Sequence, residues 1–149
     1  MSPQGRAFIG IEVKYSEDLK DEPSSHKERY EEITRESMVF RPDVIEKLKR
    51  KPLQQIWRDH LLALSLYKVN ADYKKGLFVY LYPRDNIECY QAIKGYIDTF
   101  KDPTVESSGF FPVTLEKFTG TLKTLTTEDD KWVRDFEDRY LNFAKLNSL

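Results

Sequence analysis

Apolar and polar residues alternate near the start of the chain. In residues 7–15 the apolar positions are Ile9, Ile11, Val13 and Tyr15, and the positions between them include Gly10, Glu12 and Lys14. A period of two is typical of a β-strand that packs against the core on one face. The pattern therefore predicts a strand in the middle of a sheet, with its apolar face packed and its two charged side chains together on the other face.

A second strand and a long helix are predicted further along the chain. Residues 76–83 (GLFVYLYP) form a nearly continuous apolar run between a glycine and a proline, typical of a strand covered on both faces. Residues 53–69 carry apolar side chains at helical spacing, namely Leu53, Ile56, Trp57, Leu61 and Leu64. A further apolar set on this helix, Leu62, Leu66 and Val69, predicts burial on two sides.

Shorter segments complete a predicted α/β sandwich. Residues 26–38 and a stretch after Pro42 predict helices, and a helix after residue 86 is capped by Asn86 or Asp85. Residues 109–125 predict a short extended piece and a helix. The closing segment predicts a helix with one aromatic stripe, made of Trp132, Phe136, Tyr140 and Phe143. This order predicts an α/β fold with more helix than strand, and we assign both tryptophans, Trp57 and Trp132, to its core.

Composition limits the function classes. The chain has 149 residues, of which 40% are hydrophobic, and this is enough for one domain, 1–149. Its 24 basic and 25 acidic residues nearly cancel, so affinity for nucleic acid would require a local patch. The single cysteine, Cys89, excludes an intramolecular disulfide and favours a reducing compartment. With neither a signal peptide nor a membrane-spanning run in the sequence, we expect a cytoplasmic protein.

Glu12 and Lys14 are the first candidates for chemistry. Two residues apart on a strand, they lie about 6.6 Å apart along the chain and project from the same face. A carboxylate can bind Mg²⁺, and a neighbouring ammonium can stabilise charge on a phosphate. The alternative is an ordinary charge pair on a solvent-facing strand.

The long helix carries polar groups that support the first interpretation. Gln55 and Asp59 lie one turn apart on one face, with Arg58 and His60 beside them. Such a face predicts the rim of an active site. The alternative for each residue taken alone is that it faces solvent, or that Arg58 and Asp59 form a salt link.

These residues resemble the PD-(D/E)XK nuclease superfamily, and within it a bacterial restriction-endonuclease-like family. The resemblance is carried by GIEVKYSE, LQQIWRDHLLALSLY, GLFVYLYPRDN and WVRDFEDRYLNF, and it covers nearly the whole chain. It implies a mixed sheet flanked by helices, and hydrolysis of phosphodiester bonds in DNA with Mg²⁺ or Mn²⁺. Glu12 would match the second acidic metal ligand, Lys14 the motif lysine, and Gln55 the glutamine that often supports such sites, with Gln54 adjacent to it.

The family pattern also has an aspartate on the preceding strand, which supplies the first metal ligand. Only MSPQGRA precedes the predicted strand, and it contains no acid. We therefore expect a chain that lacks the family's N-terminal segment, with an unpaired edge on its first strand. An open edge favours pairing with another chain, so a homodimer is an open alternative. Glu17 or Asp18 could also replace the aspartate.

Three functional hypotheses follow. In the nuclease hypothesis, the basic side chains that contact DNA phosphates are Lys47, Lys49, Arg50 and Lys51. Cations at the end of a helix also offset its dipole without any ligand. The second hypothesis is an inactive nuclease-fold remnant that binds nucleic acid or a protein partner. The third, an unrelated enzyme with His26 or His60 as base, is weaker, because His60 lies in an apolar helix and His26 near a helix start.

Overall fold

The computed structural model describes residues 5–15, 19, 25–69, 72–125 and 131–142. Its strands are β1 (Arg6–Val13), β2 (Tyr73–Tyr82) and β3 (Phe110–Thr114). The helices are α1 (Glu28–Ser37), α2 (Ile45–Leu48), α3 (Leu53–Val69), α4 (Ile87–Ile97), α5 (Val105–Ser108), α6 (Leu115–Leu125) and α7 (Lys131–Tyr140). This confirms the predicted α/β class and most of the predicted elements.

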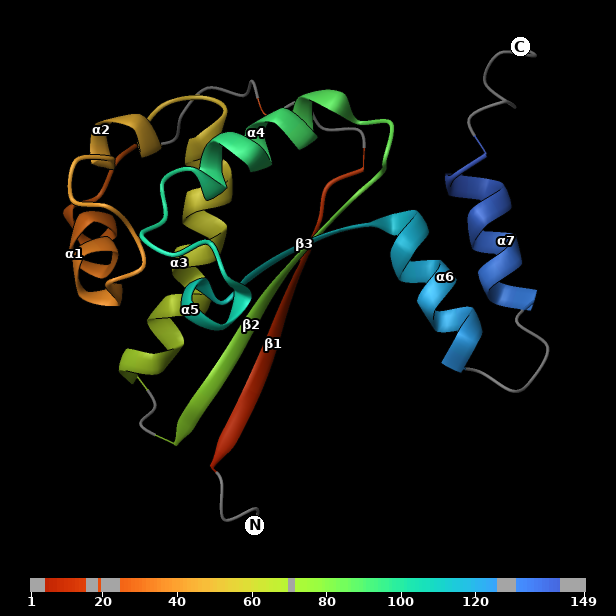
Figure 1. Ribbon diagram of the computed structural model, residues 1–149, viewed down its shortest axis with the longest axis horizontal. Helices are drawn as coiled ribbons and strands as arrows, with labels where there is room; N and C mark the ends of the chain where they lie inside the picture. The colour runs from red at the N-terminus through yellow and green to blue at the C-terminus, as the bar shows by residue number, and fades with distance from the viewer. Residues whose placement is uncertain (1–4, 16–18, 20–24, 70–71, 126–130, 143–149) are drawn as a thin grey trace.

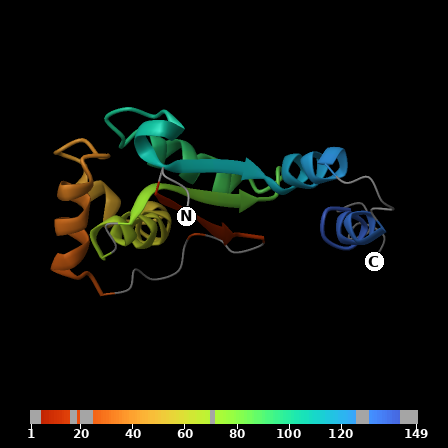
Figure 2. The ribbon, with the colours of Figure 1, turned by 90° about the horizontal axis from the view of Figure 1, so that it is seen from below.

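The described strands form one parallel sheet in the order β1-β2-β3. Parallel neighbours need long crossover connections, and here helices fill both of them. α1 to α3 lie between β1 and β2 in the chain, and α4 and α5 lie between β2 and β3. Helices α1 to α5 gather together, whereas α6 and α7 stand apart near the carboxyl ends of the strands (Figures 1 and 2).

The central strand β2 is covered on both faces, as predicted. Phe78, Tyr80 and Tyr82 point into the main core with α1, α3 and α4. Val79 and Leu81 face the opposite side, where a smaller apolar cluster includes residues of α6 and α7. Both clusters follow from the period of two along one buried strand.

The structure of β1 corrects two predictions that were made from the sequence of this strand. Within the described residues it is an edge strand, paired only with β2, so it does not lie in the middle of this sheet. Its apolar face is not packed either, since Ile9 and Ile11 are 66% and 57% exposed. Alternation places the two sets of side chains on opposite faces, but it does not decide which face the helices cover. Here the helices cover the face that carries Glu12 and Lys14.

The burial of α3 also differs from the prediction on one side of the helix. Its main stripe is buried, but Leu62, Leu66 and Val69 are exposed, so the helix is not buried on two sides. None of the helices in the described part of the chain has the length and apolar character to cross a membrane.

His60 is a core residue of α3. Its ring is fully buried, with Nδ1 2.9 Å from the Tyr96 hydroxyl and Nε2 3.0 Å from the Ser108 carbonyl oxygen. Burial lowers the pKa of His60 to about 3, because it penalises the charged ring. A neutral, enclosed ring with both nitrogens engaged cannot reach a substrate, which removes His60 as a base.

Candidate active site

The site begins with the ion pair between Glu12 and Lys14 on the helix-covered face of β1. The Lys14 Nζ lies 2.5 Å from Glu12 Oε1, and the Lys14 side chain is only 8% exposed. The Lys14 backbone N–H donates to the Leu81 carbonyl at 2.8 Å, which holds this residue beside β2. An ammonium removed from water costs free energy unless a charge partner lies beside it, and Glu12 is that partner.

α3 brings a second carboxylate, Asp59, to this pair. Burial, and next the charge of Glu12, raise the pKa of Asp59 to about 6, whereas Lys14 lowers it. The charges of both strand residues therefore act on the helix carboxylate. The Asp59 Oδ2 is buried and has no hydrogen-bond partner within the described ranges. The sequence contained a signal for this residue, its spacing of four from Gln55, but did not assign it to the chemistry.

Gln55 lies one turn before Asp59 on the same face of α3 and is half-buried. Its neighbour Gln54 is buried at 7% exposure on a different side of the helix. We define the carboxylate site as Glu12, Lys14, Gln55 and Asp59. Glu12 and Lys14 are included because they form an ion pair, Asp59 because their charges act on it, and Gln55 because it shares the Asp59 face of α3.

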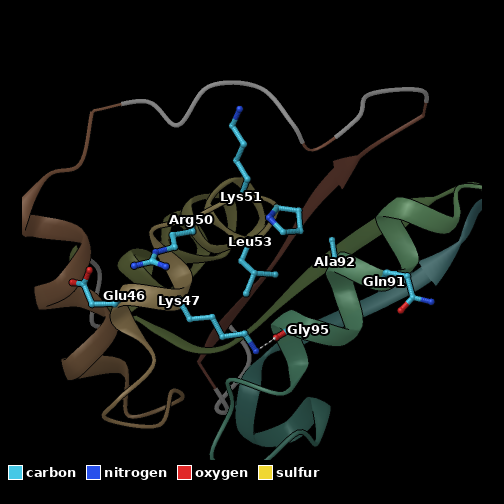
Figure 3. A pocket seen from close by; sticks show the side chains of 9 residues that line it. Glu46, Lys47, Arg50, Lys51, Leu53, Gln91, Ala92 and Gly95 are labelled. Carbon is cyan, nitrogen blue, oxygen red and sulfur yellow. Dashed lines mark hydrogen bonds between the residues drawn. The ribbon is translucent and has the colours of Figure 1, made fainter.

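The four predicted DNA-contact residues have two different environments in the structure. Lys47, Arg50 and Lys51 line a pocket of about 440 Å³ between the α2–α3 segment and α4 (Figure 3). The Lys47 Nζ donates to the Gly95 carbonyl at 3.3 Å, whereas Lys51 extends in another direction. We call this the basic pocket. Because α2 has only four residues, its dipole gives little reason for so many cations at its end.

Lys49, by contrast, is engaged in ion pairs. Its Nζ lies 2.8 Å from Glu31 and 2.7 Å from Glu46, and it does not line the basic pocket. The hydrogen bond to Glu31 raises the pKa of Lys49. This side chain therefore serves to join α1 to the α2 segment. Glu17 and Asp18, the acids considered as substitutes for the family's aspartate, lie outside the described residues.

The carboxylate site fits a divalent cation by the chemistry of its donors. Mg²⁺ and Mn²⁺ prefer carboxylate and water oxygens, and Mg²⁺ is commonly held by one or two carboxylates with substrate phosphate completing its shell. Glu12 and the buried oxygen of Asp59 are donors of this kind. The described ranges contain no group of three or more His, Cys, Asp or Glu side chains that could together hold a metal ion, so the protein would supply few ligands.

Comparison with known proteins places the chain in a family. A family model described as the PD-(D/E)XK nuclease superfamily matches residues 1–142. Comparisons with curated proteins and with solved structures gave no match. The family match extends over both strand residues of the carboxylate site and over the whole of α3, β2 and β3. The chain therefore belongs to the PD-(D/E)XK nuclease superfamily.

Proposed function

We propose that this chain is a metal-dependent DNA endonuclease that hydrolyses phosphodiester bonds at the carboxylate site. The observation that carries the proposal is the ion pair of a partly exposed Glu12 and a nearly buried Lys14 on one face of β1, with the charges of both acting on Asp59 of α3. Ionisable groups held out of water beside like and opposite charges gather at functional sites. Membership of a nuclease superfamily makes phosphodiester hydrolysis the expected chemistry.

The residues of the site have distinct roles in the proposal. Glu12 would hold Mg²⁺ or Mn²⁺, which when bound would polarise a phosphoryl oxygen and lower the pKa of bound water. The Lys14 ammonium faces the phosphate and stabilises the negative charge that develops as the water oxygen bonds to phosphorus and the leaving oxygen departs. The Gln55 amide orients the attacking water or a phosphate oxygen.

The basic pocket supplies affinity for the DNA backbone in this proposal. Lys47, Arg50 and Lys51 are local cations in a chain whose formal net charge is only −1. Cations that contact phosphates position the duplex without reading its sequence. Such contacts also make binding sensitive to salt.

Cleavage of supercoiled plasmid and of single-stranded DNA tests the proposal. The chain is incubated with Mg²⁺, with Mn²⁺ or with a chelator, and we expect nicking that requires the metal. DNA binding without cleavage in either metal would contradict the endonuclease and support the alternative, a catalytically inactive nuclease-fold protein that binds nucleic acid. Absence of both binding and cleavage would leave a protein partner as the remaining alternative.

Lys14→Ala tests the catalytic role of the lysine. We expect turnover to fall by about a hundredfold to a thousandfold, because a charge-stabilising group acts mainly in the transition state. The affinity for DNA should change little. Single-turnover rates and a binding isotherm measure the two effects separately. A loss of affinity with an unchanged single-turnover rate would instead make Lys14 a phosphate contact.

The triple variant Lys47→Gln, Arg50→Gln and Lys51→Gln tests the basic pocket. We expect weaker DNA binding and a plot of log affinity against log salt that is shallower by about one unit per lost phosphate contact. The rate at saturating DNA should be unchanged. The matched control removes three exposed lysines elsewhere, Lys75, Lys101 and Lys117. An equal loss of affinity in both variants would show a general charge effect.

A further inference from the structure

One oxygen of the carboxylate site has no partner that the described residues provide. The Asp59 Oδ2 is buried without a hydrogen bond. A buried carboxylate oxygen left in this state costs free energy, and folded proteins rarely retain one without a reason. The unpartnered Oδ2 of Asp59 therefore points to a ligand that binds this oxygen.

The surrounding charges indicate which kind of ligand that is. Glu12 on β1 and Asp59 on α3 are two carboxylates, and the charge of Glu12 acts on Asp59. Lys14 is one ammonium, and its Nζ already lies 2.5 Å from Glu12. With both carboxylates ionised the site has an excess of negative charge, which a bound cation would offset.

The neighbouring arginine is directed elsewhere. The Arg58 guanidinium carbon lies 5.6 Å from the centre of the Tyr30 ring, over a residue of α1. Neither Arg58 nor Lys14 donates a hydrogen bond to the buried Asp59 Oδ2. The oxygen donors on both elements suit a hard divalent ion that retains several waters.

We propose that Asp59 is the second carboxylate ligand of the divalent ion that Glu12 holds, so that the ion joins β1 to α3. The inference rests on the proposed function for the identity of the ion. It assigns a metal-binding role to the helix, in a chain whose residues 1–11 contain no acidic side chain. An ion bound by two elements also stabilises the fold, because it binds the folded state and not the unfolded one.

Mn²⁺ binding to the full chain tests this without any measurement of activity. Free Mn²⁺ is followed by electron paramagnetic resonance during titration of the parent chain, Asp59→Asn and the control Asp43→Asn, whose side chain is exposed on the α1–α2 segment. We expect Asp59→Asn to weaken Mn²⁺ binding by at least about tenfold. It should also lose the rise in melting temperature that Mn²⁺ gives the parent. Asp43→Asn should match the parent in both.

The outcomes separate this inference from the nuclease proposal. Equal Mn²⁺ affinity in Asp59→Asn and the parent, or no Mn²⁺ binding by the parent, would overturn the inference even if plasmid cleavage is observed. Lost binding in Asp59→Asn with no cleavage by the parent in any metal would support the inference and contradict the nuclease. A circular dichroism melt checks folding, and Asp59→Ser serves as a second variant without a carboxylate. Recovery of Mn²⁺ binding in Asp59→Glu would further support a ligand role.

Discussion

Glu12→Gln is expected to lower the rate of metal-dependent DNA cleavage by at least about a thousandfold, which corresponds to about 4 kcal/mol of transition-state stabilisation. The amide keeps the shape of the side chain but cannot supply a negatively charged oxygen to the ion. The Lys14 ammonium, 2.5 Å from this carboxylate, also loses its charge partner. Metal binding and the placement of the lysine are thus both impaired by one substitution.

Single-turnover cleavage of plasmid across a range of Mg²⁺ and Mn²⁺ concentrations measures this effect. Glu28→Gln is the matched control, since Glu28 is exposed at the start of α1. Glutamine is preferred to alanine at position 12, because alanine would remove the hydrogen-bonding group that directly contacts the nearly buried Lys14 ammonium. A Glu12→Gln protein that cleaves DNA at the parent rate would remove Glu12 from the site.

Trp57→Ala is expected to lower the free energy of unfolding by about 3–5 kcal/mol. The Trp57 side chain is fully buried, and its Nε1–H donates to Thr34 Oγ1 at 2.9 Å. Its ring stacks on His26 with centroids 5.9 Å apart and packs edge-on against Tyr30. Truncation would open a cavity between α1 and α3 and leave the Thr34 hydroxyl without this partner.

Trp132→Ala serves as the contrast and corrects a prediction made from the sequence. This side chain on α7 is 57% exposed, so its assignment to the core is wrong, and its removal should cost little. Urea unfolding followed by circular dichroism measures both variants with the same probe. Equal destabilisation of the two would contradict the burial that separates them. Phe143, placed on the same aromatic stripe, lies outside the described residues.

Local sequence predicted the elements well where a single strong pattern was present. α3 begins and ends at the predicted residues because Leu53, Ile56 and Trp57 repeat at helical spacing. α4 begins after Asn86, whose Oδ1 accepts the Cys89 N–H at 2.9 Å, as its capping signal indicated. These features depend on residues a few positions apart, so the sequence alone contains them.

The packing of those elements was less predictable. The alternation in β1 correctly separated Ile9 and Ile11 from Glu12, but the helices cover the charged side. On α3, Leu62 is as apolar as Leu61, yet it faces solvent. Periodicity defines faces relative to one another, and only the arrangement of distant segments decides which face becomes the interior.

The sequence by itself determined the α/β class, the positions of the strands and long helices, and the pairing of Glu12 with Lys14 on one strand face. The tertiary structure decided that Asp59 of α3 lies within the electrostatic reach of that pair, and that Lys49 joins α1 instead of lining the basic pocket. The reason is physical. Neighbours on one element follow from its repeat, whereas contacts between β1 and α3 depend on the register of β1 with β2 and on how α3 packs across the sheet.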